Sequence, residues 1–389
     1  MKDATKLIHF TDDDLLVGGK FVKTINPPVS LASTVLFERY EDLVLANAGQ
    51  YEGVVYGTDR MPLQRTFEEA IRELEGGGLT RAFQSGIGAI INTLLAFTRS
   101  GDHVLICDNA YGPTWRFCAE VMSRYQVEIS AAPATAGADI VGHLRPNTTL
   151  ILLESPGSLT FELQDIPAIT AIARERGILT ALDNTWATPL YLKPFQLGVD
   201  VSIQSVTKYI AGHSDVLMGT VTVTEALAQR FATYYRAMEV FVSPEDCYLA
   251  LRGLRTLPVR LRQHERSALE IATWLGTQDR VDQVIHPGLP SHPEHHLWQR
   301  DFLGASGLFA FTFKEDYPTA RLAAFVNALQ LFGIGYSWGG FKSLITAGPC
   351  RRQLTSRYAG RTVVRLNIGL EDAGDLMQDL EMAMAMLGN

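Results

Sequence analysis

Short apolar runs alternate with amphipathic segments in the middle of the chain, from about residue 80 to residue 225. The amphipathic segments at 87–97, 114–124 and 166–176 have the spacing of helices that bury one face. Strands that alternate with helices in this way indicate a mostly parallel sheet covered by helices on both faces. The strands are predicted at the apolar runs 82–83, 104–107, 150–153, 178–182, 201–203 and 220–223.

The N-terminal region follows no such pattern. Residues 1–55 lack a long period of either kind and are interrupted by Asn26-Pro27-Pro28, which predicts an irregular arm. Such an arm either packs on a neighbouring subunit or forms a loop on its own domain. The first regular element expected after it is an amphipathic helix from Leu63 to Leu74, which Gly76-Gly77-Gly78 ends.

A second, smaller α+β domain is predicted after Ser243. Ser243 and Asp246 resemble a capping box at the start of a long helix, and Pro258 is expected to kink or divide that helix. Beyond it we expect strands at 308–313 and 363–368 and helices at 318–331 and 373–387. The predicted fold class is therefore α/β, with an N-terminal arm at 1–55, an α/β domain at 56–243 and a C-terminal α+β domain at 244–389.

Composition narrows the classes of function. The chain has 389 residues, of which 47% are hydrophobic and 20% charged, as in a globular protein with a large core. A net charge of −8 without a long basic run argues against nucleic acid as a partner. Early acidic residues and the lack of an apolar run of ~18 residues argue against a signal peptide and a membrane span, so we expect a cytoplasmic protein. The four scattered cysteines predict buried thiols, with no metal site and no disulfide framework.

Polar residues with catalytic potential lie at the carboxyl ends of the predicted strands. In a parallel sheet these ends meet at one edge, and ligands bind there. Glu154, Asp183 and Ser205 each end or follow a predicted strand. Lys208 comes shortly after Ser205, between Thr207 and apolar residues.

Lys208 and Asp183 together indicate a site for pyridoxal phosphate (PLP). This cofactor needs a lysine for a Schiff base, a carboxylate for its pyridinium nitrogen and donors for its phosphate. Burial of Lys208 would lower the pKa of its amine, which favours Schiff-base chemistry, and the freed amine can carry protons. Alone, Lys208 could be a surface lysine and Asp183 a turn residue, but the pair favours the cofactor.

Other residues could hold the phosphate and the ring of such a cofactor. Ser205 and Thr207 carry hydroxyl groups near Lys208. Gly86 and Ile87 lie at the start of a predicted helix, where free backbone N–H groups bind anions. Tyr111 follows a predicted strand and could stack on a flat ring. Each of these residues alone is as readily a turn or packing residue.

Arg365 lies inside a strand that otherwise belongs to a core, so its guanidinium needs a partner. That partner is either the carboxylate of a substrate, bound by two hydrogen bonds, or a structural carboxylate of the protein. The loop Tyr336-Ser337-Trp338-Gly339-Gly340 either lines a pocket or forms a simple turn.

With these residues placed, the chain resembles the PLP enzymes of cysteine, homocysteine and methionine metabolism, the cystathionine lyase family. The resemblance extends from about Leu31 to Leu387 and is strongest to the bacterial β-lyases of the family. Trp338 contributes most to the choice among subfamilies. The segments that carry the resemblance are 154–158, 183–187, 205–208, 212–215, 251–257 and 336–340.

The resemblance implies a fold type I (aminotransferase-like) architecture and a role for each candidate residue. Lys208 would form the Schiff base and move the proton of the substrate Cα, and Asp183 would pair with the pyridinium nitrogen. Tyr111 would stack on the ring and assist proton transfer. The resemblance also implies phosphate contacts from Gly86, Ile87, Ser205 and Thr207, and substrate contacts from Arg365, Ser337, Trp338 and Ser158.

The resemblance further implies that subunits share their sites. Tyr56 would reach the phosphate in a neighbouring subunit, so the family pattern implies a dimer at least and usually a homotetramer. The family usually places an arginine where this chain has Thr58. Either Arg60 substitutes for it from a shifted loop, or the phosphate loses a charge-assisted bond worth about 1.5–3 kcal/mol. The segment Phe341-Lys342-Ser343 also departs from the family and leaves the substrate preference open.

The reaction that the resemblance implies is β-elimination of cystathionine, a small amino-acid substrate, to homocysteine, pyruvate and ammonia, as in methionine biosynthesis. Cystine and other cysteine S-conjugates remain alternative substrates. A γ-acting relative (γ-lyase or γ-synthase) and a poorly catalytic regulatory homologue remain alternative functions. A Rossmann-type dehydrogenase also fits the alternation, but the chain lacks a G-x-G-x-x-G turn after its first predicted strand.

Overall fold

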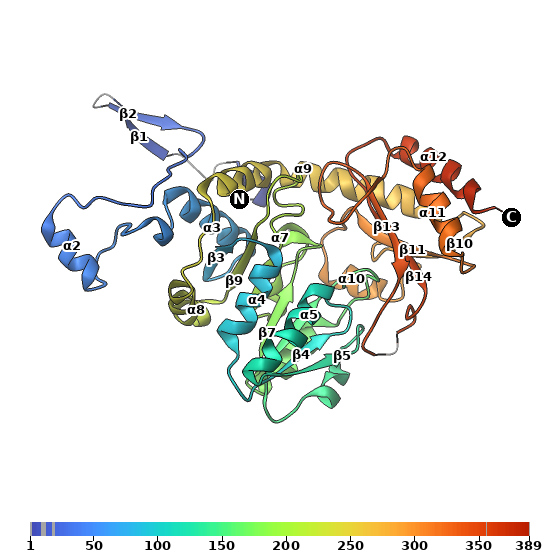
Figure 1. Cartoon of the computed structure of the whole chain (residues 1–389), viewed down its shortest axis with the longest axis horizontal. Coiled ribbons are helices and arrows are strands. Elements are labelled where there is room, and N and C mark those ends of the chain that lie inside the picture. The colour runs from blue at the N-terminus through green and yellow to red at the C-terminus, as the bar shows by residue number, and fades with distance from the viewer. Residues whose placement is uncertain (1, 9–12, 18–19, 355, 389) are drawn as a thin grey trace.

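The computed structural model describes residues 2–8, 13–17, 20–354 and 356–388. A seven-stranded sheet in the order β3-β9-β8-β7-β6-β4-β5 forms the centre of the larger part of the chain (Figure 1). The strands from β8 to β5 in this order are parallel to one another, whereas β9 is antiparallel to both of its neighbours. The strands are β3 (Leu79–Phe83), β4 (His103–Cys107), β5 (Glu128–Ala132), β6 (Thr148–Glu154), β7 (Leu179–Asp183), β8 (Val201–Gln204) and β9 (Gly219–Val223).

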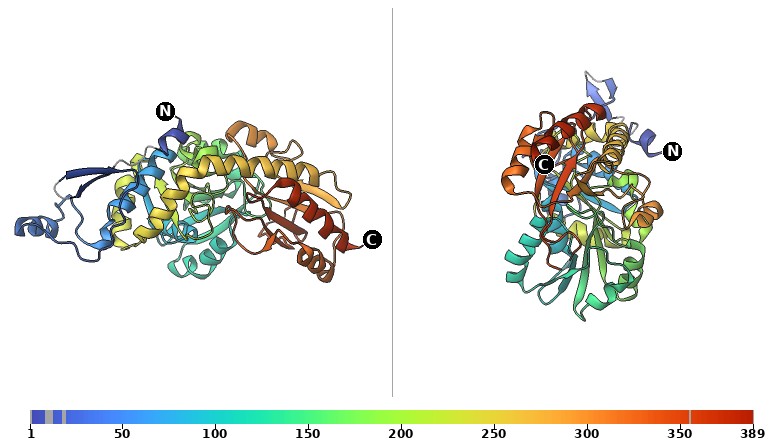
Figure 2. Two further views of the ribbon diagram at one scale, coloured as in Figure 1. Left: turned by 90° about the horizontal axis from the view of Figure 1, so that it is seen from above. Right: turned by 90° about the vertical axis from the view of Figure 1, so that its right-hand side faces the viewer.

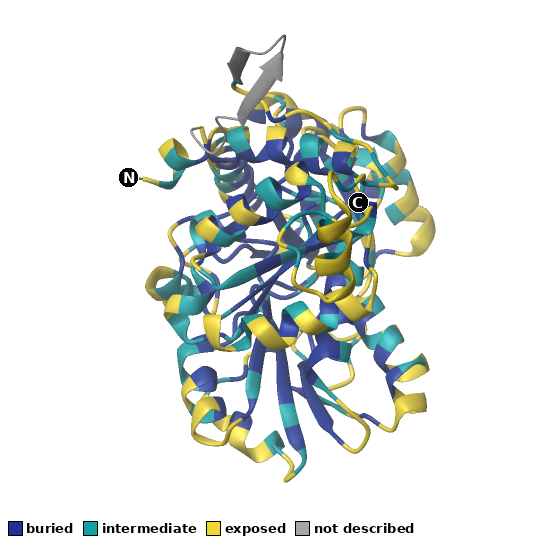
Figure 3. Ribbon diagram, turned by 90° about the vertical axis from the view of Figure 1, so that its left-hand side faces the viewer, coloured by how far each residue is buried: buried dark blue, intermediate teal, exposed yellow. Residues whose placement is uncertain are grey.

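Helices flank this sheet and bury its strands. Every residue of β4, β8 and β9 is buried, as expected for strands covered on both faces, and the helices turn their exposed sides to solvent (Figure 3). The helices α3 and α4 pack against strands near the β3 edge, and α6 packs against β7. The flanking helices are α3 (Pro62–Glu75), α4 (Gly86–Phe97), α5 (Gly112–Glu120), α6 (Ile166–Glu175), α7 (Thr188–Tyr191) and α8 (Glu225–Ala237).

A five-stranded sheet in the order β10-β11-β14-β13-β12 forms the C-terminal part. The long helix α9 (Pro244–Leu275) runs along both parts (Figure 2). The first half of α9 packs in one core with α3, and its last turns pack in the core of the C-terminal sheet. The remaining elements are β10 (Val281–Ile285), α10 (His295–Asp301), β11 (Leu308–Phe313), α11 (Thr319–Ala328), β12 (Gly333–Ile334), β13 (Leu344–Pro349), β14 (Thr362–Asn367) and α12 (Ala373–Met384).

The N-terminal region contains more structure than its sequence predicts. The described residues include α1 (Asp3–Lys6), an antiparallel pair of β1 (Asp13–Val17) and β2 (Lys20–Thr24), and α2 (Tyr40–Asn47). The expectation of an irregular arm is therefore wrong for these elements. Helix α2 stands away from the body of the chain and has no buried residue (Figure 1).

Helix α9 corrects one half of a second expectation, that Pro258 kinks or divides it. It is one helix from Pro244 to Leu275, so Pro258 does not divide it. The cap predicted at Ser243 is present, because the Ser243 side chain accepts a hydrogen bond from the N–H of Glu245 at 3.2 Å. The strands expected at 308–313 and 363–368 are confirmed by β11 and β14, whereas β5, β10, β12 and β13 were not predicted. The division into domains at residues 55 and 243 stays a prediction.

The four cysteines are free and buried, as the sequence predicts. Within the described residues, no helix combines the length and the apolar character that crossing a membrane requires.

Glu75 is a buried carboxyl group on the face of α3 that packs on the sheet. Its Oε1 accepts hydrogen bonds from Ser202 at 2.9 Å and Gln204 at 3.1 Å, both on β8, and its side chain is 2% exposed. Burial raises the pKa of Glu75 from 4.5 to about 7, and the two hydrogen bonds and Lys193 only partly oppose this rise. The buried anion thus forms at the expense of stability.

We predict that Glu75→Gln removes a loss of stability with rising pH. The pKa of Glu75 is about 7 in the folded chain and 4.5 in the unfolded chain, so the unfolded chain ionises first. The free energy of unfolding should fall between these two pH values by about 3 kcal/mol in total. Urea unfolding at about pH 5 and about pH 8 should show this fall in the wild type and a smaller one in Glu75→Gln.

Glu69→Gln is the matched control on the same helix. The carboxylate of Glu69 is exposed and bonded to Arg72, which lowers its pKa, so this variant should keep the fall seen in the wild type. An equal fall in Glu75→Gln and wild type would contradict the prediction.

Candidate active site

A cavity of about 210 Å³ lies between the carboxyl ends of the parallel strands and the C-terminal sheet. The strands β6 and β7, the turn after β8, the start of α4, and the C-terminal strands β11 and β14 all contribute to its wall. Residues far apart in the sequence therefore meet at the edge where parallel sheets bind ligands. The predicted site residues that line it are Gly86, Ile87, Tyr111, Ser158, Asp183, Ser205, Thr207, Lys208, Trp338 and Arg365.

Lys208 lies in the turn after β8 with its amine directed toward the C-terminal sheet. Its Nζ donates a hydrogen bond to Ser337 Oγ at 2.7 Å and lies 5.3 Å from the centre of the Trp338 ring. Burial lowers the pKa of Lys208 from 10.5 to about 8, Arg365 lowers it further, and Asp183 opposes both. The amine is thus partly neutral near physiological pH, as a Schiff-base lysine requires.

Asp183 ends β7 at the floor of the cavity. Its Oδ1 accepts hydrogen bonds from the N–H of Thr185 at 3.0 Å and from the Thr185 hydroxyl. Burial raises the pKa of Asp183, whereas the Thr185 hydrogen bonds and Lys208 lower it. Thr185 therefore orients this carboxyl group and favours its charged form.

The start of α4 forms an anion-binding end of the cavity. Ser85 caps the helix by accepting a hydrogen bond from the N–H of Gly88 at 3.0 Å. The N–H groups of Gly86 and Ile87 belong to the first turn and have no acceptor within the helix. A Cβ at Gly86 would come within 2.4 Å of Ser205 Oγ, so only glycine allows this close approach.

The hydroxyl of Thr207 forms hydrogen bonds with the backbone of Met218. Thr207 Oγ1 donates to the carbonyl of Met218 at 3.1 Å and accepts from the N–H of Met218 at 2.9 Å. A bond from Thr207 to phosphate would replace its bond to the Met218 carbonyl. The phosphate role of Thr207 stays a prediction.

Arg365 reaches the cavity from β14. Its Nη2 donates to the carbonyl of Ser337 at 3.3 Å, and burial lowers its pKa. Among the residues that the structure describes, no carboxylate lies within ion-pair distance of Arg365, so the structural partner considered for it is not found there. Ser337 has a φ of 78°, in the left-handed region that non-glycine residues adopt only when their surroundings hold them.

Tyr111 and Glu154 both line the cavity and are joined by a hydrogen bond. Tyr111 precedes α5 and is 44% exposed, and its N–H donates to Glu154 Oε2 at 2.7 Å. Burial raises the pKa of the Tyr111 phenol, a charge on Glu154 would raise it further, and Arg365 opposes both. Sequence analysis placed Glu154 at a strand end but gave it no role.

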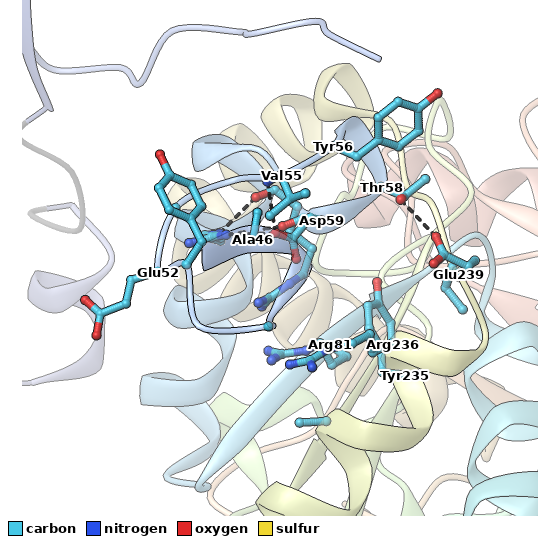
Figure 4. A pocket seen from close by; sticks show the side chains of 17 residues that line it. Ala46, Glu52, Val55, Tyr56, Thr58, Asp59, Arg81, Tyr235, Arg236 and Glu239 are labelled. Carbon is cyan, nitrogen blue, oxygen red and sulfur yellow. Dashed lines mark hydrogen bonds and ion pairs between the residues drawn. The ribbon is translucent and has the colours of Figure 1, made fainter. Parts of the chain in front are cut away.

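Tyr56, Arg60 and Thr58 lie away from this cavity, in a second hollow of about 500 Å³ between the N-terminal segment and α8 (Figure 4). Tyr56 is 52% exposed, and the Thr58 hydroxyl donates to Glu239 at 2.9 Å. Arg60 donates to Glu68 at 2.8 Å. As a phosphate ligand, Arg60 would have to leave this ion pair.

Sequence reasoning missed several residues of the cavity wall. Thr185 had a detectable signal, because a hydroxyl residue two positions after an aspartate forms the local turn seen here. Leu217 and Leu308 had none, since each is an ordinary apolar residue whose position in the cavity depends on long-range packing.

These residues fit PLP in shape and in chemistry. The cavity combines a lysine of lowered pKa, a hydrogen-bonded carboxyl group at a strand end and the first turn of α4, which is open because Gly86 lacks a side chain. When bound, PLP withdraws electrons from the Cα of an amino acid and makes its proton acidic. Lys208 would hold the aldehyde carbon, Asp183 the ring nitrogen, and the start of α4 with Ser205 the phosphate.

We predict that Lys208→Ala abolishes the visible absorbance of the PLP-loaded protein, because no other amine lines the described cavity. Borohydride should attach the cofactor to the wild type and to the control Lys342→Ala, which lacks an exposed lysine near the same loop, but not to Lys208→Ala. Binding of PLP to the apo protein should accelerate as pH rises through about 8, where the Lys208 amine loses its proton. A visible band in Lys208→Ala would contradict this assignment.

Known proteins resemble the chain over almost its whole length. Residues 5–385 match the family described as Cys/Met metabolism PLP-dependent enzyme. Cystathionine beta-lyase MetC of Escherichia coli (strain K12) is 39% identical over 388 residues, 97% of this chain and 98% of that protein. L-alanine/L-glutamate racemase of Wolbachia pipientis wMel is 39% identical over 379 residues, 94% of this chain and 93% of that protein.

A solved structure confirms the fold. Cystathionine gamma synthase from Xanthomonas oryzae pv. oryzae, in complex with aminoacrylate and cysteine, superposes with a TM-score of 0.89 at 31% identity and covers 100% of this chain and 98% of that one. The expected fold type I architecture is thus present, with PLP as the cofactor that its family uses. The chain belongs to the Cys/Met-metabolism family of PLP-dependent enzymes.

Proposed function

We propose that the chain is a carbon–sulfur β-lyase that converts cystathionine to homocysteine, pyruvate and ammonia. The arrangement around Ser337 carries the proposal. The Ser337 hydroxyl accepts from the Lys208 amine at 2.7 Å, and its carbonyl accepts from Arg365 at 3.3 Å. The base and the cation for the substrate carboxylate are therefore held by one residue.

This arrangement suits removal of the Cα proton of an amino acid. A carboxylate bound by Arg365 is attached directly to Cα, so Cα would lie near the Lys208 amine. Lys208 takes the Cα proton, the Cβ–S bond breaks with its electron pair going to sulfur, and a proton on sulfur completes homocysteine. The 2-aminoacrylate that remains reacts with water to give pyruvate and ammonia.

Trp338 favours a single, oriented base. The centre of its ring lies 5.3 Å from Lys208 Nζ and 5.5 Å from the centre of the Tyr209 ring. Tyr209 is the residue that follows Lys208 in the chain. The Trp338 ring and the Ser337 hydroxyl beside the amine limit its reach and exclude water from it. The name of the relative from Escherichia coli agrees with β-elimination, whereas the solved neighbour is named as a γ-synthase, so a γ-acting enzyme is the second candidate.

We propose that a second copy of the chain completes the site. Tyr56 is exposed and lies outside the cavity of its own chain, and α2 beside it has no buried residue. A neighbouring chain that covers this segment would place Tyr56 at its own phosphate end. The homotetramer, the cytoplasmic location and the role in methionine biosynthesis stay predictions.

We predict that purified protein loaded with PLP releases pyruvate from cystathionine and one thiol per pyruvate. Lactate dehydrogenase detects pyruvate, and chromatography of the keto acid distinguishes it from 2-oxobutyrate. Lys208→Ala is the inactive control. Release of 2-oxobutyrate would assign a γ-lyase instead, and racemisation of alanine without keto acid would assign the activity named in the relative from Wolbachia.

We also predict that Thr58→Arg tightens PLP binding about tenfold, because a charge-assisted bond to phosphate is worth about 1.5–3 kcal/mol. Thr58→Val is the control, since it removes the bond to Glu239 without adding charge. The dissociation constant is measured by adding PLP to apo protein and following absorbance.

Arg60→Met tests the competing explanation with the same assay. If Arg60 only pairs with Glu68, this variant loses thermal stability but keeps its PLP affinity. An Arg60→Met protein that loses about tenfold or more in affinity would show that Arg60 binds the phosphate.

A further inference from the structure

Glu154 is a second carboxyl group in the cavity beside Asp183. It is the last residue of β6, and the parallel pairing of β6 with β7 places it opposite Asp183, the last residue of β7. Both side chains line the cavity, so both emerge on the same side of the sheet edge. Two carboxyl groups in adjacent register at a buried edge rarely ionise together.

The surroundings of Asp183 stabilise a negative charge better than those of Glu154. Asp183 accepts two hydrogen bonds from Thr185 and faces the Lys208 amine. Glu154 accepts one hydrogen bond, from the N–H of Tyr111 at 2.7 Å. Within the described part of the chain, no cation lies within ion-pair distance of Glu154.

The other groups packed around Glu154 still leave it with less stabilisation of a negative charge than Asp183 has. On β4, the thiol of Cys107 accepts the N–H of Glu154 at 3.1 Å, and burial keeps that thiol neutral by raising its pKa. Arg352 favours the charged form of Glu154, but only from beyond ion-pair distance. Burial and then Asp183 raise the pKa of Glu154 well above its ordinary value.

Arg352 and Asp108 are occupied elsewhere. Arg352 donates to the carbonyl of Ser158 at 3.0 Å, and Asp108 accepts the N–H groups of Gln353 and Leu354. Arg352 is therefore bonded to a carbonyl and not to Glu154, and the carboxyl group of Asp108 supplies no positive charge.

We propose that Glu154 carries the proton of this carboxyl pair while PLP is bound, so that Asp183 alone holds the negative charge for the pyridinium nitrogen. Glu154 is then a positioning residue. Its neutral carboxyl group still accepts the Tyr111 N–H through one oxygen, and so fixes the backbone from which the Tyr111 ring reaches the cofactor. The proposal rests on cofactor binding and not on the cystathionine reaction.

A neutral Glu154 affects the pKa values of two other groups in the cavity. A charged Glu154 would add a second anion next to the ring nitrogen and raise the pKa of the Lys208 Schiff base and of the Tyr111 phenol. A neutral Glu154 leaves both groups easier to deprotonate. It keeps the hydrogen bond that a purely apolar residue would lose.

Glu154→Gln and Glu154→Ala separate charge from positioning. Glutamine keeps an oxygen for the Tyr111 N–H and cannot ionise, whereas alanine removes both. The matched reference is Asp183→Asn, which removes the negative charge at the neighbouring strand end. All variants are prepared with PLP bound and compared by difference infrared spectroscopy and by titration of the visible absorbance with pH.

We expect the C=O stretch of a protonated carboxylic acid in the wild type and in Asp183→Asn, and its loss in Glu154→Gln. The pKa of the Schiff-base absorbance in Glu154→Gln should stay within about 0.3 of the wild-type value, because no charge is removed. In Asp183→Asn it should fall by about one unit or more. Glu154→Ala should weaken PLP binding about tenfold and change the circular dichroism of the bound cofactor, since Tyr111 loses its anchor.

Two results would overturn the proposal. One is an infrared spectrum in which Glu154→Gln removes a carboxylate band instead of a carboxylic acid band. The other is a fall of the Schiff-base pKa in Glu154→Gln as large as that in Asp183→Asn. Neither measurement uses turnover of cystathionine, so a protein that fails as a β-lyase can still support or contradict the assignment of Glu154.

Discussion

The site depends on keeping the Lys208 amine in a place where water cannot solvate its charge. Desolvation is the largest cause of its low pKa, and the Trp338 ring and the Ser337 hydroxyl replace water as its neighbours. This requires the C-terminal part to close over the carboxyl ends of the central sheet, because Ser337, Trp338 and Arg365 all come from it. Neither part of the chain alone could therefore form the cavity.

The sequence predicted the central sheet well because its strands are buried on both faces. Strands of this kind appear as continuous apolar runs, so β4, β6, β7 and β8 lie within a few residues of their predicted positions. Strand β5 has no such run, since residues 128–132 are mostly half-buried, and it was missed. Helix α2 was missed because it has no buried residue, so no core of its own chain sets its pattern.

The candidate site was predictable where chemistry follows strand ends and unpredictable where it depends on distant pairs. Lys208, Asp183 and Ser205 are each close to the end of a strand, which sequence can locate. The partner of Arg60 could not be found in this way, because its ion pair with Glu68 depends on how the turn before α3 folds back on that helix. The same holds for Ser337, whose left-handed backbone is set by contacts to Lys208 and Arg365.

Helix α9 is continuous at Pro258, although we expected this proline to kink or divide it. Proline has no N–H for the preceding turn, which usually breaks a helix. The N–H missing at Pro258 would have bonded the carbonyl of Leu254, four residues earlier, so the helix lacks that hydrogen bond. The helix continues because Leu254, Leu257 and Leu261, on both sides of the proline, are buried in the core shared with α3.

The turn of α9 around Gly253 packs against the turn that follows Lys208, the predicted Schiff-base lysine. A Cβ at Gly253 would come within 2.2 Å of the carbonyl of Ala211, so glycine lets the helix backbone touch the turn that follows Lys208. Arg260 also donates to the carbonyl of Ile210 at 3.3 Å, which ties the two backbones together. Glycine is unfavourable in the middle of an isolated helix, yet Gly253 lets α9 approach the turn after Lys208 without an intervening side chain. A glycine that is unfavourable for the isolated helix is therefore required for the contact between α9 and the turn after Lys208.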